Sequence, residues 1–424
     1  VDVLKRKSDH TWDLIEIKSS TRAKPEHLID LAFQKIVLES AGLMVSSLSV
    51  LHVDNSYVRQ GEIDPQKLTN STDVTADVLA LVESTKQQIE QARQILAQRA
   101  CPDLSPRHVN LHQVAGANWF QDYLAVYHHL HPQLDKYSIY HLSYPNAKQI
   151  VQLEEQGIGL ISDMPEDLAL RPKQVLQIRT TRTNKRIIEL DKIRYFLAGF
   201  TYPLFFLDYE TFSGIIPEFD GCRPYSDYPF QYSLHILERP GAELEHREYL
   251  HADSANPMPG LLTSLQKDIG AKGAILAWNM SYEQGCNDTM ADLFPEYADF
   301  LADLNDRMQD LMLPFSELWV VDKDFMGSAS LKKVLPVLAP DLSYQDLAVS
   351  DGLLARRLWT NTVLHGQNPA DKSRILADLS KYCTLDTYAM VRIFEELQKM
   401  AAIKLDSDLQ QKKQARKPDQ LKMF

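Results

Sequence analysis

The sequence predicts an α/β protein in which mixed sheets are covered by helices, arranged over more than one domain. The chain has 424 residues, of which 44% are hydrophobic and 24% are charged, and this is an ordinary globular composition. Short apolar runs alternate with segments of helical periodicity, which is typical of sheets covered by helices. At about 150 residues per domain, the length predicts two or three domains. Because no apolar run reaches the roughly 18 residues that span a bilayer, we expect no membrane helix.

The first 100 residues are predicted to form strand, strand, helix, strand and helix. Residues 11–18 (TWDLIEIK) alternate polar and apolar side chains, as half-buried strands do. Residues 28–40 place apolar side chains at helical spacing, and Gly42 ends that helix. Residues 48–53 form another short apolar run, and residues 75–99 are expected to form a long helix.

Residues 110–200 predict helices joined by turns, and a second sheet is expected beyond residue 200. Its strands are predicted at residues 203–209 (PLFFLDY), 230–237 and 273–279 (GAILAWN). Their continuous apolar character indicates strands buried on both faces. Residues 372–400 form a long amphipathic helix in this interpretation, and residues 411–424 form a polar, basic and loose end.

The net charge and the cysteine content indicate which ligands and which cellular compartment to expect. The net charge of −12 opposes binding of phosphate backbones by the surface as a whole, but local basic stretches can still bind them. Residues 171–186 carry six Lys or Arg and no acid, so they can bind phosphates. The alternative interpretation of this stretch is a solvated helix face. Phosphate contacts are predicted for Arg179, Arg182, Lys185 and Arg186, and base stacking for Phe212, Tyr225 and Tyr228. Four scattered cysteines without a C-x-x-C pair indicate a reduced, cytoplasmic protein.

Three pairs of polar residues in the C-terminal half are spaced as a divalent-metal site would require. Asp208 and Glu210 lie two apart on an apolar strand, so both side chains point to one face. Two carboxylates on a buried strand repel each other and lose hydration, and divalent cations relieve both penalties. The second pair, Asn279 and Glu283, follows a predicted strand. The third pair, Tyr382 and Asp386, lies on one face of a predicted helix. Such a set can hold two Mg²⁺ or Mn²⁺ ions about 4 Å apart, as phosphodiester cleavage uses.

This pattern resembles the DEDDy branch of the 3′–5′ exonucleases, which have a ribonuclease H-like fold. The motifs D-x-E, N-x-x-x-D and Y-x-x-x-D occur here in order as D-Y-E, N-M-S-Y-E and Y-C-T-L-D. The resemblance implies that Tyr382 orients the attacking water and that the metal ligands are Asp208, Glu210, Glu283 and Asp386. Glu283 departs from the family, which has Asp there, and its extra methylene displaces the carboxylate by about 1.5 Å, enough to alter rate or metal preference. Residues 187–400 also resemble a bacterial family catalogued as a domain of unknown function.

Lys332 and Asp310 are weaker candidates in the same region. Lys332 can reach a substrate phosphate, but an ordinary solvated helix lysine is the better interpretation. Asp310 can assist a metal site, but the end of a helix or strand is favoured.

A second set of polar residues lies near the N-terminus. Glu16 and Lys18 share one face of a strand, Asp2 precedes them by a gap that fits a hairpin, and Gln34 lies on the next helix. The pattern resembles the PD-(D/E)XK nucleases, in particular RecB-like and CRISPR-associated ones. The resemblance implies that Asp2 and Glu16 bind metal and that Lys18 positions water or stabilises the charged transition state. The alternative is a surface ion pair. Because the chain begins at Val1, the helix and strand expected before Asp2 are missing, and we expect an N-terminally incomplete module.

Together these features predict a nuclease built from four segments. They are a PD-(D/E)XK-like domain (1–110), a helical connector (111–200), a ribonuclease H-like exonuclease domain (201–403) and a basic tail (404–424). The expected activity is Mg²⁺- or Mn²⁺-dependent hydrolysis of nucleic acid at a 3′ end. DNA is favoured over RNA, DNA repair is the expected context, and no membrane partner is expected. The alternative is an inactive nucleic-acid-binding or scaffold protein built on nuclease folds.

Overall fold

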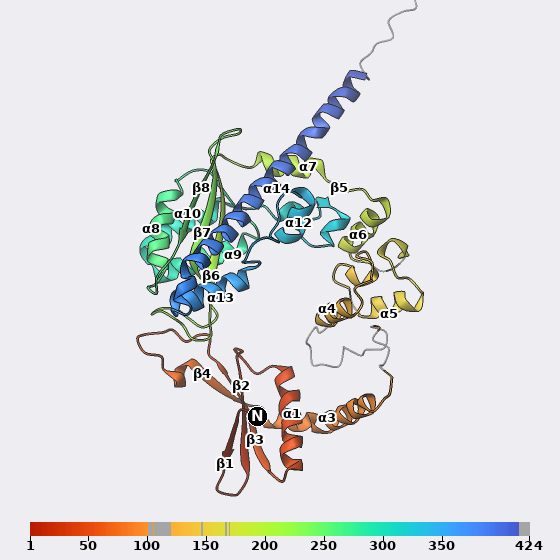
Figure 1. The fold of residues 1–424 in the computed structure, drawn as a ribbon, viewed down its shortest axis with the longest axis vertical. Coiled ribbons are helices and arrows are strands. Elements are labelled where there is room, and N and C mark those ends of the chain that lie inside the picture. The colour runs from red at the N-terminus through yellow and green to blue at the C-terminus, as the bar shows by residue number, and fades with distance from the viewer. Residues whose placement is uncertain (101–104, 106–119, 146, 166–167, 169, 415–424) are drawn as a thin grey trace, which may run out of the picture. The chain divides into compact units, whose positions relative to one another are not determined.

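The chain is a mixed α/β protein, described here from a computed structural model (Figure 1). The structure describes residues 1–100, 105, 120–145, 147–165, 168 and 170–414. The chain divides into two compact units. The first comprises Val1–Tyr140, Tyr144–Leu160 and Ser213–Ser226, and the second comprises His141–Ser143, Ile161–Phe212 and Asp227–Phe424. Residues of the predicted helical connector are therefore shared between the two units.

The first unit contains a four-stranded sheet in the order β1-β2-β3-β4. The strands are β1 (Val3–Arg6), β2 (Trp12–Lys18), β3 (Val45–Val53) and β4 (Thr69–Asp73). β2 runs parallel to β3, whereas β1 and β4 are antiparallel to their neighbours. The helices are α1 (Pro25–Ser40), α2 (Pro65–Leu68), α3 (Thr75–Leu96), α4 (Phe120–Leu130) and α5 (Ala147–Glu155).

The core of this unit lies between its sheet and the helices α1 and α3. Leu14, Leu31, Leu48 and Val78, from β2, α1, β3 and α3, are almost completely buried against one another. Gly42, at a φ of 85°, follows the end of α1, because glycine adopts the left-handed region without steric penalty. The predicted order strand, strand, helix, strand is confirmed, and β4, which is polar and mostly exposed, was not predicted.

The second unit is built around a five-stranded mixed sheet in the order β10-β9-β6-β7-β8. The strands are β6 (Leu204–Phe212), β7 (Tyr228–Leu237), β8 (Leu244–Leu250), β9 (Ala274–Ala277) and β10 (Met308–Asp310). β6, β9 and β10 are parallel, and β7 is antiparallel to both β6 and β8. A separate pair is formed by β5 (Ile187–Ile188) and β11 (Val320–Val321).

The second unit also contains helices of varied length. They are α6 (Pro172–Thr183), α7 (Leu190–Ala198), α8 (Met258–Asp268), α9 (Ser281–Leu293), α10 (Ala298–Arg307), α11 (Leu313–Ser316), α12 (Leu331–Leu338), α13 (Gly352–Trp359) and α14 (Lys372–Gln414). Short 3₁₀ turns occur at Ile139–His141, Ile161–Asp163, Pro295–Tyr297, Lys323–Phe325 and Pro369–Asp371, and a π-helical turn at Thr360–Leu364. The predicted tail begins inside α14, and residues 415–424 lie outside the described residues.

Alternate residues of β7 show which helices cover which face. Gln231 Nε2 donates to the Leu379 carbonyl oxygen on α14 (3.3 Å), whereas the hydroxyl of Tyr232 donates to Asp268 on α8 (2.6 Å). Because successive side chains of a strand point to opposite faces, α14 and α8 cover opposite sides of the sheet (Figure 1). The predicted sheet with both faces covered is confirmed, and the many apolar and aromatic residues of β6 and β7 follow from that burial.

The end of β9 leaves part of β6 exposed to the helices that follow. The pairing of β9 with β6 ends at Leu276 opposite Phe206, whereas β6 continues to Phe212. Asp208 and Glu210 therefore lie beyond the last residue of β9 that pairs with β6. After β9 the chain turns and enters α9. Within the described residues, no helix is both long and apolar enough to cross a membrane.

Candidate metal centre

Four carboxylates from three elements of the second unit line one cavity of about 280 Å³. β6 supplies Asp208 and Glu210, α9 supplies Glu283, and α14 supplies Asp386. The cavity is also lined by Tyr209, Thr211, Trp278, Asn279, Tyr282, Gly352, Arg356 and Tyr382. The folding of this unit thus brings together the residues that the three sequence motifs predicted as a metal site.

Local geometry explains why these side chains face the cavity. Asp208 and Glu210 alternate with Tyr209, whose hydroxyl donates to Asn287 Oδ1 (3.0 Å) on the other face of the sheet. Tyr382 and Asp386 are one turn apart on α14, so they share a face of that helix.

Burial makes the charged forms of these carboxyls unfavourable. The residues Glu210, Glu283 and Asp386 are 7%, 2% and 7% exposed. Loss of hydration raises the pKa of Glu210 and of Glu283 to about 8, and that of Asp386 to about 6. Burial raises the pKa of Asp208 well above its ordinary value, and repulsion by the neighbouring carboxylates adds to this. Without cations, the cluster therefore retains protons near neutral pH.

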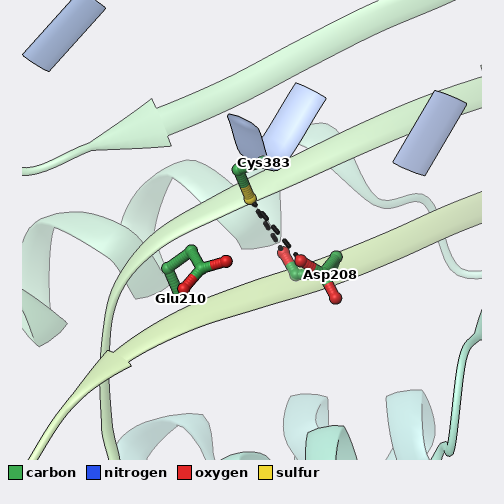
Figure 2. Close-up of side chains that lie close together, drawn as sticks. All are labelled: Asp208, Glu210 and Cys383. Carbon is green, nitrogen blue, oxygen red and sulfur yellow. Dashed lines mark hydrogen bonds between the residues drawn. The ribbon is translucent and has the colours of Figure 1, made fainter. Parts of the chain in front are cut away.

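The carboxylates have few protein donors. Tyr344 donates its hydroxyl hydrogen to Asp386 Oδ1 (2.5 Å), which lowers the pKa of Asp386 and partly offsets its burial. The thiol of Cys383 donates to Asp208 Oδ2 (3.7 Å), as Figure 2 shows. Glu283 Oε2 is buried and has no hydrogen-bond partner among the described residues.

These residues fit a divalent cation. An unpartnered buried carboxylate oxygen is costly unless a further group pairs with it, and hard cations such as Mg²⁺ and Mn²⁺ take oxygen ligands of this kind. The ligands would come from Asp208, Glu210, Glu283 and Asp386.

Tyr382 and Lys332 lie against the carboxylates. Tyr382 is 4% exposed, and burial raises the pKa of its hydroxyl, so this group stays protonated. Lys332 Nζ lies 5.2 Å from the Tyr382 ring centroid and donates to the Ser350 carbonyl oxygen (2.6 Å). Its charge lowers the pKa of both Glu210 and Asp386. Lys332 is therefore close enough to influence the carboxylates but is still partly exposed, and its contact with a substrate phosphate stays a prediction.

Arg356 lines the cavity and was not anticipated from the sequence. It forms an ion pair with Asp227 (2.5 Å) and donates to the Thr211 carbonyl oxygen (3.2 Å). An arginine in a helix carries no spacing signal of its own, and only the fold brings α13 to the end of β6. Tyr344 was missed for the same reason.

Asn279 and Asp310 form the turn that leads into α9. Asn279 adopts a φ of 68°, which asparagine tolerates better than most residues, and its backbone N–H donates to Asp310 Oδ1 (3.0 Å). The same oxygen accepts from the N–H of Met312 (2.9 Å). Because β10 ends at Asp310, the interpretation of this residue as an element boundary is confirmed.

The residues predicted to contact nucleic acid have different environments. Arg182 donates to the carbonyl oxygens of Ser162 and Met164, and Arg186 pairs with Asp322 (2.8 Å), so both have internal partners. Arg179 and Lys185 are exposed.

The aromatic residues predicted for base stacking are mostly buried. Phe212 and Tyr228 are 3% and 4% exposed, so the prediction that they stack on bases is wrong. Their rings pack against each other at a centroid distance of 5.6 Å, inside the core at the end of β6. Tyr225 belongs to the first unit and is 37% exposed.

The N-terminal candidate residues also come together, within the first unit. Lys18 Nζ donates to Glu16 Oε1 and to Asp30 Oδ2, each at 2.7 Å. Gln34 Nε2 donates to the other oxygens of the same two carboxylates, each at 3.0 Å. Gln34 Oε1 is buried and has no hydrogen-bond partner among the described residues. Asp30 was missed by sequence reasoning, although its position one turn before Gln34 on α1 is a usable signal.

Asp2 lies beside this network. The antiparallel pairing of β1 with β2 places Val3 opposite Ile15, and Asp2 Oδ2 accepts from the backbone N–H of Ile17 (2.7 Å). Asp2 is exposed, whereas Glu16 is 6% exposed. Among the described residues, neither belongs to a group of three metal-ligating side chains whose atoms lie within 4.8 Å of one another.

Comparison with known proteins finds partial matches that carry no described activity. A family model described as a domain of unknown function (DUF2779) matches residues 205–330, which include Asp208, Glu210 and Glu283 but not Asp386. The chain is also similar to "Uncharacterized protein MG366" of Mycoplasma genitalium, at 24% identity over 208 residues. That match covers 44% of this chain and 31% of the relative. No solved structure matches the chain.

Proposed function

We propose that this protein is a metal-dependent nuclease that hydrolyses phosphodiester bonds, acting as a 3′–5′ exonuclease on DNA through its second unit. The observation that carries the proposal is the buried, unpartnered oxygen of Glu283 in a cavity lined by three further carboxylates. Such a cluster is costly without bound cations and is the ligand set that two-metal nucleases use.

The arrangement of the second sheet supports the ribonuclease H-like part of the proposal. In chain order its five main strands lie as 5-4-1-2-3, and the second is antiparallel to its neighbours. A mixed sheet covered by helices agrees with the ribonuclease H-like α/β fold that the resemblance to the DEDDy exonucleases implies. The D-x-E carboxylates lie on the central strand, and the Y-x-x-x-D residues lie on the helix that crosses it.

Mg²⁺ or Mn²⁺ held by the four carboxylates would polarise a phosphoryl oxygen and lower the pKa of a water molecule. The protein's own groups act around that centre. The protonated hydroxyl of Tyr382 orients the attacking water, and Tyr344 holds Asp386 in place through its hydrogen bond. Arg356 and Lys332 supply positive charge at or near the cavity. This charge stabilises the negative charge that develops on the phosphate as the bond breaks. The exposed Arg179 and Lys185 are proposed to contact the phosphate backbone.

The N-terminal network supports a second nuclease site as part of the same proposal. A lysine held between two carboxylates, with a buried glutamine oxygen unpartnered beside them, matches the PD-(D/E)XK resemblance in residue type. Asp2 and Glu16 would bind the metal there. Lys18 would exchange its bonds with Glu16 and Asp30 for a phosphate oxygen, while Gln34 holds the carboxylates.

The proposal is tested with 5′-labelled and 3′-labelled single-stranded DNA and RNA in the presence of Mn²⁺ or Mg²⁺. Wild type is compared with Asp208→Asn, Lys18→Ala and Asp306→Asn. Asp306 is an exposed aspartate at the end of α10, so its variant removes the same charge without touching the cavity. We expect a 5′-labelled ladder that shortens from the 3′ end and disappears in Asp208→Asn but not in Asp306→Asn.

Each other outcome has a distinct meaning. Activity lost in Lys18→Ala but retained in Asp208→Asn would assign the chemistry to the N-terminal site. Faster digestion of RNA than of DNA would correct the substrate. If wild type leaves all substrates intact with both metals, the inactive nucleic-acid-binding or scaffold alternative is favoured.

A further inference from the structure

A cysteine thiol lies directly against the carboxylates of the candidate metal centre (Figure 2). Cys383 is fully buried on α14, and its Sγ lies 3.7 Å from Asp208 Oδ2 and 3.9 Å from the Asp208 carbonyl oxygen. Ligand atoms of Asp208, Glu210 and Cys383 all lie within 4.8 Å of one another. A thiol is a poor ligand for Mg²⁺, and a two-metal hydrolysis does not require it.

The spacing suits an ion that accepts sulfur. Zinc bonds to thiolate sulfur at about 2.3 Å and to carboxylate oxygen at about 2.0 Å, so sulfur and oxygen on one tetrahedral ion are about 3.5 Å apart. The observed separation of Sγ and Asp208 Oδ2 is 3.7 Å, close to that value. The three side chains can therefore approach one tetrahedral ion with small rotamer adjustments.

A second observation points to a cation at the same place. Glu283 is 2% exposed, lines the same cavity as Asp208 and Glu210, and has a buried oxygen without a partner among the described residues. Glu283 is not one of the three clustered residues, so it can serve as a fourth ligand only if its side chain moves toward them within the shared cavity.

We propose that Cys383 is a thiol ligand through which this site binds a thiophilic divalent cation, Zn²⁺ or its probe Cd²⁺, in competition with Mg²⁺ and Mn²⁺. As the sulfur–metal bond forms, the thiol proton passes to solvent. The inference rests on the proposed function, because both require the four carboxylates to form a metal site. It adds a form of regulation, because a tightly held Zn²⁺ occupies ligands that Mg²⁺ or Mn²⁺ needs, so Zn²⁺ is expected to inhibit the nuclease.

The test measures Cd²⁺ and Mn²⁺ binding to the full chain by isothermal titration calorimetry, with sulfur-to-cadmium charge-transfer absorption recorded in parallel. Cys383→Ser and Cys383→Ala are compared with wild type. Cys286→Ser is the matched control, because Cys286 is another buried thiol of the same unit but is not among the three clustered ligands. Asp208→Asn removes a carboxylate that is proposed to bind both Cd²⁺ and Mn²⁺.

We expect wild type and Cys286→Ser to bind Cd²⁺ with charge-transfer absorption. In both Cys383 variants the absorption should vanish and the ratio of Cd²⁺ to Mn²⁺ affinity should fall by at least about tenfold, the scale on which supporting groups at metal sites act. Equal loss of Cd²⁺ and Mn²⁺ affinity would show a structural role for Cys383 and overturn the inference, as would wild-type Cd²⁺ binding without charge-transfer absorption. In either case, Mn²⁺ binding by the wild type leaves the proposed nuclease centre standing. Failure of wild type to bind either metal refutes both.

Discussion

Replacing Glu283 by Gln should change how the stability of the metal-free protein depends on pH. Burial raises the pKa of Glu283 from 4.5 to about 8. Because the folded-state pKa lies above the unfolded value, the contribution of this carboxyl to stability is complete below about pH 4.5. It is lost as pH rises through about 8. The full difference between the two pKa values corresponds to on the order of 5 kcal/mol, at 1.36 kcal/mol for each tenfold change in the equilibrium, and about 4 kcal/mol of it falls between pH 5 and pH 9.

Glutamine has nearly the same shape and does not titrate, so Glu283→Gln lacks this pH dependence. The stability of the variant relative to wild type should therefore rise by up to about 4 kcal/mol between pH 5 and pH 9. At about 2–4 °C per kcal/mol, this is a relative gain in Tm of up to roughly 8–16 °C. The buried amide adds an offset that is the same at both pH values, so only the change with pH tests the argument.

The assay is thermal denaturation in chelator-containing buffer at pH 5, 7 and 9, with Asp306→Asn as the control. The histidines titrate in both proteins and cancel in the comparison. An offset between variant and wild type that is the same at all three pH values would refute the reasoning, because it would mean that Glu283 is ionised in the folded protein at pH 5.

Three further predictions concern the same unit. The rise in Tm on adding Mn²⁺ should be larger at pH 8 than at pH 6, because metal binding requires the two glutamates to lose their protons; equal shifts at both pH values would contradict this. Tyr344→Phe removes a hydrogen bond that lowers the pKa of Asp386, so the midpoint of the Mn²⁺ response should move to higher pH, whereas an unchanged midpoint would argue against that role. Trp359→Ala should lower the free energy of unfolding by about 3–5 kcal/mol in denaturant titrations, because this side chain is fully buried and stacks on Phe230 at 4.3 Å. A loss below about 1 kcal/mol would show that the core around it collapses to fill the space.

Local periodicity was sufficient to predict most elements of the fold that carry the site. β6 and β7 are buried on both faces, so their sequences are rich in apolar and aromatic residues. α1 ends where Gly42 permits a left-handed turn. β4 was missed because it is polar and mostly exposed, so it carries no apolar alternation. α14 runs beyond the predicted residue 400, because no proline or glycine follows to end it before residue 414.

The sequence by itself also determined the ligand types and their spacing: Asp208 with Glu210 on a strand, and Tyr382 with Asp386 on a helix. Strand and helix periods decide which side chains share a face, and those periods are local properties of the chain. Tertiary structure alone decided that Cys383, Tyr344 and Arg356 meet these carboxylates, and that Phe212 and Tyr228 are buried in the core rather than available to bases. These contacts join elements that lie far apart in the sequence. They depend on where β9 ends and on how α13 and α14 cross β6, which no local pattern specifies.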